Sequence, residues 1–160
     1  MFGLDWPETL FVLMAFGLQL VLIMHFALRR WRFAAAIRLG PWVYALSLPA
    51  TAVSLVLLID GQPWWLWLGG FLFLVWAIFG YVVEYVRQIE WRTARRWSIF
   101  GPYVLLYLAT VMFYWWPLAR LYRPLWFVYA GLFLVSTALN VASHRPGKEN
   151  GRSSLVRNGR

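Results

Sequence analysis

The sequence predicts an all-α integral membrane protein, a bundle of five transmembrane helices built from antiparallel helix hairpins. Of its 160 residues, 62% are hydrophobic and only 13% are charged, too few charges to cover a soluble domain of this size. The apolar residues are gathered in five long runs, and all fifteen Lys and Arg lie outside those runs. Composition and charge position therefore both indicate a membrane protein.

Each run is close to the ~20 residues that a helix needs to cross a bilayer. The short connections at Asp60–Pro63 and Pro117–Pro124 predict that the second and third runs, and the fourth and fifth, form hairpins. Residues 144–160 are polar and basic, and we expect them to form a flexible cytoplasmic tail. One membrane domain, 1–143, is therefore predicted, with spans at 9–28, 41–59, 64–86, 99–116 and 125–143.

The basic residues predict the orientation of these spans. Thirteen of the fifteen lie in segments 29–40 and 87–98 and in the tail. These three segments follow the first, third and fifth spans, so they lie on the same side of the membrane. The other side carries only Arg120 and Arg123. Because cytoplasmic loops are enriched in Lys and Arg, we expect the N-terminus outside and the C-terminus inside, in a bacterial or archaeal plasma membrane. Such loops also account for the net charge of +9, so nucleic acid is not an expected partner.

The tryptophans favour the same arrangement. Eleven of the twelve fall near the predicted ends of the spans, where the amphipathic indole ring is most stable, and only Trp76 falls mid-membrane. We interpret the eleven as an aromatic belt at the two membrane surfaces.

Polar side chains, mostly hydroxyls, recur at helical spacing in three spans, so each set shares one helix face. Polar groups avoid lipid chains, and these faces are expected to point into the bundle. Ordinary helix packing explains such stripes as well as a solute path does, because small and hydroxyl residues commonly join membrane helices. The stripes are Tyr44–Ser47–Thr51–Ser54, Tyr103–Tyr107–Thr110–Tyr114 and Tyr129–Ser136–Asn140–Ser143.

A polar layer near the cytoplasmic ends of the spans is the candidate site. Glu84 is the only acidic residue inside an apolar run, and an intramembrane carboxylate or imidazole is a functional candidate. We expect Glu84 and His25 to be linked, directly or through other members of the layer, with the aromatic interior above them. The candidate ligand-binding residues are His25, Tyr44, Trp76, Glu84, Tyr103, Tyr107 and Asn140.

Simpler interpretations of the two ionisable groups remain open. Arg87 and Gln88 follow Glu84 at i+3 and i+4, so a local pair at the headgroup level would also satisfy the carboxylate. His25 lies one turn before an arginine cluster and could extend towards the headgroups in the same way.

The sequence lacks the usual parts of an enzyme. It has no cysteine and no HExxH, GxSxG or phosphate-loop pattern, which favours a protein without catalytic activity. Haem would depend on His25 and His144, the only histidines, and the sequence identifies no cofactor.

Two segments, Trp97–Thr110 and Ser136–Ser143, resemble stretches of the tryptophan-rich sensory protein/translocator family, whose five-helix members bind tetrapyrroles and sterol-like ligands. The family's WYxxLxKPxWxPP motif is absent, and the two segments lie in adjacent spans here, whereas two helices separate them in that family. No site residue is assigned from this resemblance.

Two classes of function remain. The first is a non-enzymatic accessory or assembly subunit that packs against other membrane proteins or against itself. The alternative is binding or transport of a small apolar or amphipathic ligand inside the bundle, with Glu84 and His25 at its cytoplasmic mouth.

Overall fold

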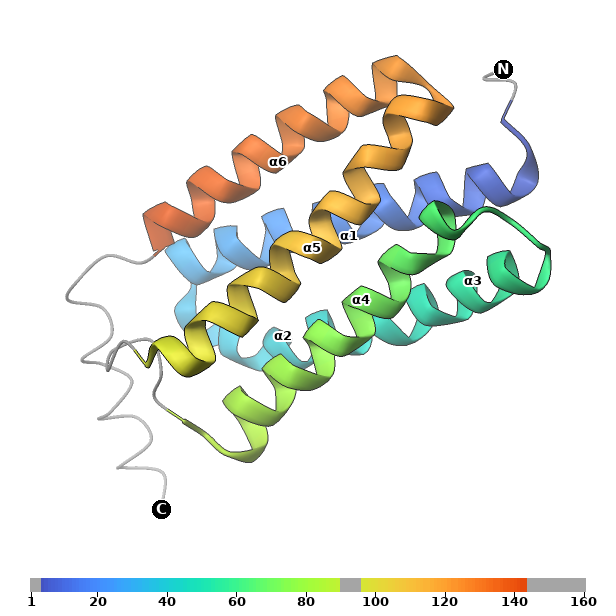
Figure 1. The fold of residues 1–160 in the computed structure, drawn as a ribbon. Coiled ribbons are helices and arrows are strands. Elements are labelled where there is room, and N and C mark those ends of the chain that lie inside the picture. Colours follow the sequence, from blue (N-terminus) through green and yellow to red (C-terminus); the bar gives the residue numbers. More distant parts are fainter. Residues whose placement is uncertain (1–3, 90–95, 144–160) are drawn as a thin grey trace.

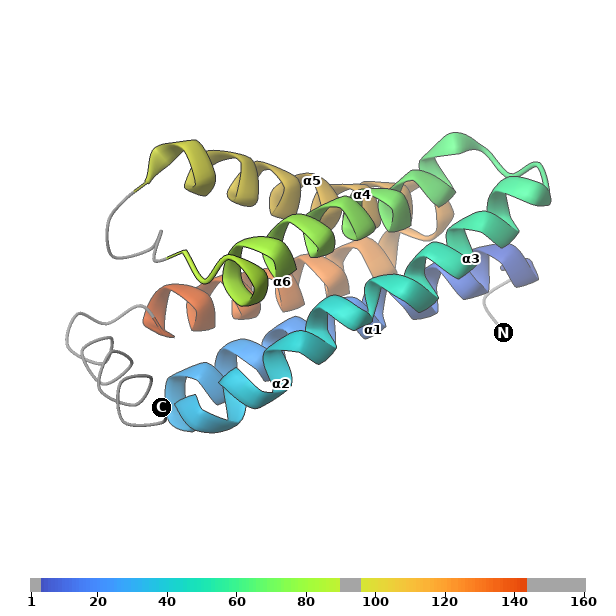
Figure 2. The ribbon, with the colours of Figure 1, turned by 90° about the horizontal axis from the view of Figure 1, so that it is seen from below.

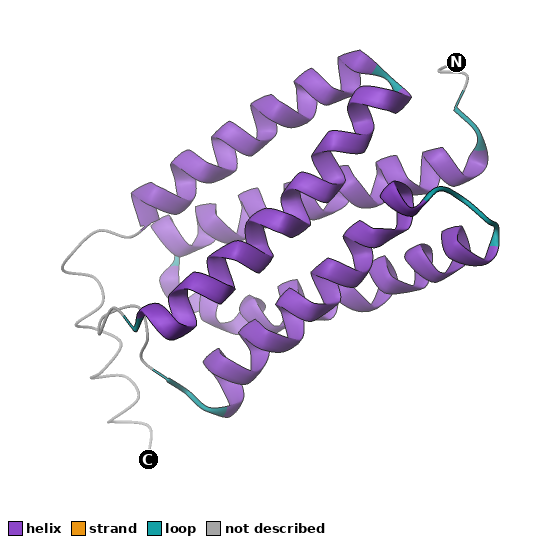
Figure 3. Cartoon of the chain, in the orientation of Figure 1, coloured by secondary structure: helices purple, strands orange, loops and turns teal. Residues whose placement is uncertain are grey.

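The computed structural model describes residues 4–89 and 96–143, and every regular element in this part of the chain is helical (Figure 3). The predicted tail and His144 lie outside the described residues. In chain order the elements are α1 (Trp6–Trp31), α2 (Phe33–Ala45), α3 (Ser47–Ile59), α4 (Trp64–Tyr81), the π-helical η1 (Val82–Val86), α5 (Trp97–Leu121) and α6 (Arg123–Ser143).

In the part of the chain that the structure describes, five helical stretches are long and apolar enough to cross a membrane, as the sequence predicted. They are α1, the 27-residue pair of α2 and α3, α4 with η1, α5, and α6. Length and composition therefore fit a multi-pass membrane protein.

The predicted connection at 29–40 is wrong in length, because nearly all of it is helical. α1 continues to Trp31, only Arg32 leaves the helical conformation, and α2 begins at Phe33. Arginine has good helix propensity, and its long side chain can reach water from a helix end, so a cluster of arginines need not end a helix.

A break between α2 and α3 was not predicted. It follows from Pro49, which has no N–H to donate to the carbonyl of Ala45, the residue four positions earlier. The helix is interrupted at Leu46, between Ala45 and Ser47, and α2 packs chiefly on α1 whereas α3 packs chiefly on α4.

The predicted connection Pro117–Pro124 is also mostly helical. α5 continues through Pro117 to Leu121, and Tyr122 alone separates it from α6. Pro117 cannot donate to the carbonyl of Phe113, which instead lies against Gly69 of α4, where an added Cβ would sit 3.4 Å from the oxygen. Gly69 thus lets α4 approach α5 closely at the carbonyl of Phe113, which receives no helical hydrogen bond from Pro117.

The turn between α3 and α4 has a local cause. Gly61 adopts φ +72, and the amides of Gly61 and Gln62 donate to the carbonyls of Leu58 and Leu57. This is a Schellman cap, which ends a helix at a residue that tolerates the left-handed conformation. α3 and α4 then pack along each other.

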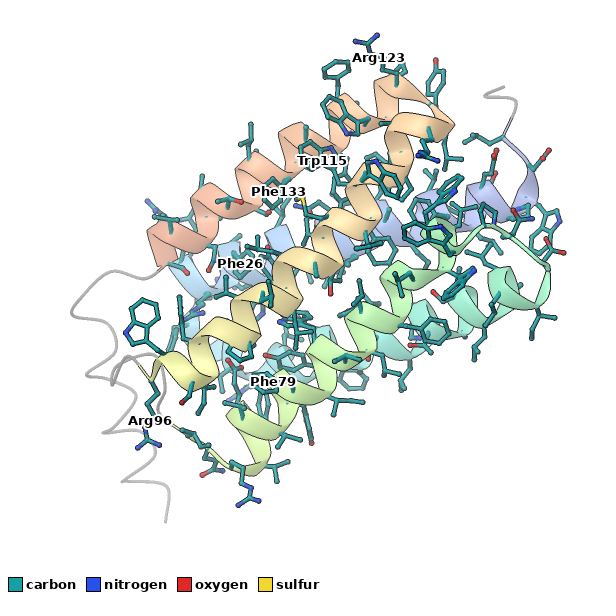
Figure 4. All side chains as sticks on the ribbon, in the orientation of Figure 1. Phe26, Phe79, Arg96, Trp115, Arg123 and Phe133 are labelled. Carbon is teal, nitrogen blue, oxygen red and sulfur yellow. The ribbon has the colours of Figure 1, made fainter. Side chains whose placement is uncertain are left out.

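The bundle has two unlike ends. At the arginine-rich end α1, η1 and α6 finish and α2 and α5 begin; at the opposite end lie the α3–α4 and α5–α6 connections (Figures 1 and 2). Figure 4 shows Arg96 and Arg123 at these two ends. The half near the opposite end is tightly packed, with fully buried Phe11, Leu18, Phe73 and Leu118.

Candidate functional site

A cavity of about 520 Å³ lies in the arginine-rich half of the bundle. Binding pockets for small molecules typically measure about 300–1,000 Å³, so its size fits a ligand. Residues from α1, α2, α4, η1, α5 and α6 line it.

Helical periodicity explains why these side chains converge. On α1, Leu22, His25, Phe26 and Arg29 follow i, i+3, i+4, i+7 and form one stripe along the cavity. On α6, Phe133, Thr137 and Asn140 follow the same rule, as do Phe100, Tyr103, Val104, Tyr107 and Leu108 on α5.

All seven residues that the sequence singled out line this one cavity. His25 comes from α1, Tyr44 from α2, Trp76 from α4 and Glu84 from η1. Tyr103 and Tyr107 come from α5, and Asn140 comes from α6. The structure places them together, while their role in binding stays a prediction.

Hydrogen bonds join three of the seven residues across three elements. The Tyr44 hydroxyl donates to Oε2 of Glu84 at 3.1 Å, and it lies 3.2 Å from the hydroxyl of Tyr103. Glu84 is thus joined directly to Tyr44 and through Tyr44 to Tyr103, while the expected link between Glu84 and His25 stays a prediction. They tie η1 to α2 and α5, and so fix the carboxylate on the cavity wall.

Two glycines allow the tyrosines to sit where they do. An added Cβ on Gly80 would lie 2.7 Å from the ring of Tyr44, and one on Gly40 would collide with the hydroxyl of Tyr85. Because these positions lack a side chain, the rings pack directly on the backbone of the neighbouring helix.

Trp76 forms the aromatic end of the cavity. Its ring centroid lies 5.5, 5.7 and 5.6 Å from those of Tyr44, Tyr103 and Tyr107, and 5.7 Å from that of Phe73. These spacings are favourable for aromatic pairs. Its Nε1 is buried and has no hydrogen-bond partner within the described chain, and such a donor costs about 1–3 kcal/mol. A ligand with an acceptor atom, or a water, would satisfy it.

Sequence reasoning missed three polar features. Arg29 lines the cavity and is 8% exposed, although it was assigned to a loop. Its i+4 spacing from His25 was the available signal. Gln19 is buried in α1 and donates to Ser136 of α6 at 2.8 Å. The π-helical turn that carries Glu84 left no signal, and such turns are frequent at functional sites.

The cavity is open on one side and closed towards the opposite end. All buried residues of α5 lie between Thr110 and Leu118, and its first half has none. The lining residues Phe100 and Leu108 of α5 and Thr137 of α6 are exposed. α5 and α6 diverge towards the arginine-rich end (Figures 1 and 2), and the lining residue Ile37 of α2 is exposed as well. Beyond Leu22 and Trp76, the fully buried Leu18 and Phe73 close it.

The five apolar helices and the one-sided cavity define a class, a small all-helical protein of the multi-pass membrane type with a cavity in one half of the bundle. No family model matches the chain, and no curated protein or solved structure matches it either. Among residues 4–89 and 96–143 there is no group of three or more His, Asp or Glu that could hold a metal ion.

Proposed function

We propose that this protein binds a small amphipathic ligand in the cavity, within the cytoplasmic half of the membrane. The observation that carries the proposal is that one cavity gathers Glu84, the only acidic residue inside a predicted apolar run, with His25, Trp76, Asn140 and four tyrosine side chains. Intramembrane ionisable groups are costly, and a bound polar ligand explains why they surround a cavity.

The distribution of side chains supports an amphipathic ligand. Leu22, Phe26, Val104 and Phe133 offer apolar contact, while Glu84, Tyr103 and Asn140 offer hydrogen bonds. An amphipathic ligand can place its apolar part against the first set of side chains and its polar part beside the second. Binding is favoured over conduction, because tightly packed residues follow the cavity towards the opposite end.

The finer topology belongs to the same proposal. The N-terminus faces outward and the C-terminus the cytoplasm of a bacterial or archaeal cell, with antiparallel hairpins of spans 2–3 and 4–5. Arg29, Arg30, Arg32 and Arg38 at the α1–α2 junction support this orientation.

The accessory-subunit function stays a prediction. Large exposed apolar side chains are spread over all five spans, as contact with lipid alone requires, so no single surface favours a protein partner. The purification described next also tests this alternative, because a subunit would carry its partner with it.

Native mass spectrometry of the full chain, purified in mild detergent, tests ligand binding. We expect a bound mass of small-molecule size. Leu108→Trp, at the cavity mouth, should reduce it at least about tenfold by filling the opening. Leu105→Trp is the matched control, because Leu105 is 70% exposed on the same helix and does not line the cavity. Equal retention by both variants would exclude binding in this cavity.

A further inference from the structure

Arg120 is an exposed cation at the opposite end of the bundle, in the last turn of α5, and it packs on aromatic rings. Its Cζ atom lies 4.7 Å from the ring centroid of Trp116 on the same helix and 5.7 Å from that of Trp65 at the start of α4. Both distances are within the range of favourable cation–π contacts. The two rings therefore restrict the position of the guanidinium group before any ligand binds.

No carboxylate of the described chain forms an ion pair with Arg120. Two acidic side chains at the same end have local partners, because Glu8 accepts from the amide of Asp5 at 3.1 Å and Asp60 accepts from Nε2 of Gln62 at 2.8 Å. A guanidinium that stacks on a ring by its face keeps its in-plane N–H groups for other hydrogen bonds. The part of the chain that the structure describes therefore supplies a fixed cation and no counter-ion for it.

The tryptophans of α4 and α5 at this end differ in the use of their indole N–H groups. Those of Trp67 and Trp115 donate to backbone carbonyls at 3.1 Å. The three indoles that form no such bond within the described chain, and that are partly or fully exposed, belong to Trp64, Trp65 and Trp116. These three lie around the guanidinium group, since the rings of Trp64 and Trp116 are 6.0 Å apart. Several hydrogen-bond donors are thus gathered without an acceptor.

The order of side chains along α5 fits a phospholipid better than a free phosphate ion. Arg120, Trp116 and Phe113 follow i, i−4 and i−7, so they share one face of the helix. At a rise of ~1.5 Å per residue, Phe113 lies ~10 Å deeper in the membrane than Arg120. The ring of Trp64 lies 6.1 Å from that of Phe113 and extends this apolar surface onto α4. A phosphate at Arg120 would thus place acyl chains against aromatic rings.

We propose that Arg120 binds the phosphate of an anionic phospholipid, with the indole N–H groups of Trp65 and Trp116 as further donors. The planar guanidinium matches two phosphate oxygens through paired hydrogen bonds. An anionic headgroup complements an unpaired cation better than a zwitterionic one, whose own ammonium group opposes the charge of the guanidinium. This site and the cavity lie at different ends of the bundle, so the inference is independent of the proposed function.

Counting bound lipid on the full chain tests the site. The purified chain and its variants are titrated with phosphatidylglycerol in mild detergent, and the lipids bound per chain are counted by native mass spectrometry. We expect Arg120→Gln to retain one phosphatidylglycerol fewer than the unaltered chain at the lipid concentration that first saturates the latter. The arginines of the arginine-rich end are the same in both proteins, so lipid bound there does not affect the difference.

Arg123→Gln is the matched control, because it removes the same charge at the same end (Figure 4). Arg123 is also exposed, but it lies over the ring of Phe127 at 5.8 Å, and phenylalanine has no N–H to donate. We expect this variant to retain the full number of phosphatidylglycerol molecules. Equal numbers on all three proteins, or an equal loss in both variants, would overturn the site at Arg120.

Two further titrations test the chemistry of the ligand. Phosphatidylcholine of the same acyl composition should be retained in equal number by Arg120→Gln and by the unaltered chain, and a loss of one molecule would overturn the anionic headgroup. Inorganic phosphate at the concentration of the lipid should leave phosphatidylglycerol bound to the unaltered chain. Its displacement would overturn the lipid and identify a site for free phosphate.

Trp116→Phe tests the indole donors and the aromatic support, and it also tests the site if Arg120→Gln fails to fold. It keeps a ring beside Arg120 but removes an N–H group and weakens the cation–π contact, so we expect about threefold weaker binding of one phosphatidylglycerol. Trp6→Phe is the control, because Trp6 is 56% exposed at the same end and has no ring contact within the described chain. Equal affinity in the two variants would overturn the contact with Trp116.

Discussion

At the scale of single residues, the Tyr44 hydroxyl connects Glu84 and Tyr103 in one polar cluster. We expect Tyr44→Phe to lower the free energy of unfolding by about 0.6–1.7 kcal/mol, the range for hydrogen bonds between membrane helices, because it removes the contacts to Glu84 and Tyr103. Reversible unfolding in mixed detergent micelles measures the change. Tyr81→Phe is the control, since Tyr81 is 44% exposed, and equal effects would show that the cluster adds no stability.

Gln19 and Ser136 form a second buried pair, and the two partners are not equivalent. Gln19 Nε2 donates to Ser136 Oγ at 2.8 Å, while Ser136 Oγ itself donates to the carbonyl of Phe133 at 2.9 Å. Gln19→Leu leaves Ser136 with a partner and removes Gln19 Oε1, which is buried with no partner in the described chain. Ser136→Ala leaves the amide donor of Gln19 buried as well.

We therefore expect Ser136→Ala to be the more destabilising change, by about 1–3 kcal/mol, and Gln19→Leu to be nearly neutral. The same unfolding measurement ranks them. The reverse order would mean that the volume or polarity of Gln19, rather than the satisfaction of its donor, decides the stability of this contact between α1 and α6.

At the scale of elements, glycines set how closely α4 approaches α2. Gly80→Ala places a Cβ 2.7 Å from the ring of Tyr44 and should cost about 1–3 kcal/mol through overpacking. Gly17→Ala on α1 meets nothing within 4 Å and should instead stabilise by about 0.5–1 kcal/mol through helix propensity. If both substitutions stabilise the protein, Tyr44 has room to move, and the close approach of α4 to α2 does not depend on Gly80.

The existence of the helices was predictable from the sequence, and their ends were less so. A run of about 20 apolar residues has one stable conformation in a bilayer, so all five spans were found. The positions of the helix ends depend on the conformational preferences and contacts of single residues. Arginines were taken as loop residues although they continue α1, and Pro117 was taken as a helix end although α5 tolerates it beside Gly69.

The site was partly predictable for a similar reason. Depth in the membrane can be counted along each helix, which is why Glu84, Tyr44 and Tyr103 were expected at one level. Counting residues along a helix does not give the rotation of the helix about its axis, and it does not predict the π-helical turn at η1. It also predicts no site residue in a segment that was already assigned to a loop. The place of Arg29 on the cavity wall and the π-helical turn at η1 therefore appear only in the structure.

At the scale of the whole molecule, the cavity and most of the arginines lie at the same end. The orientation of the protein in the membrane therefore decides in which leaflet the cavity lies. The six arginines in the described chain near that end predict that it faces the cytoplasm (Arg29, Arg30, Arg32, Arg38, Arg87 and Arg96). The sequence contains no cysteine, so a single introduced thiol reports one position without background.

We expect a membrane-impermeant maleimide to label Asp60→Cys in intact cells, because Asp60 is exposed in the turn between α3 and α4 at the opposite end. Arg32→Cys, exposed at the α1–α2 junction, should be labelled only after the cells are permeabilised. The two variants control for each other in expression and thiol reactivity. The reverse pattern would place the cavity in the outer leaflet, and labelling of both in intact cells would contradict a single orientation.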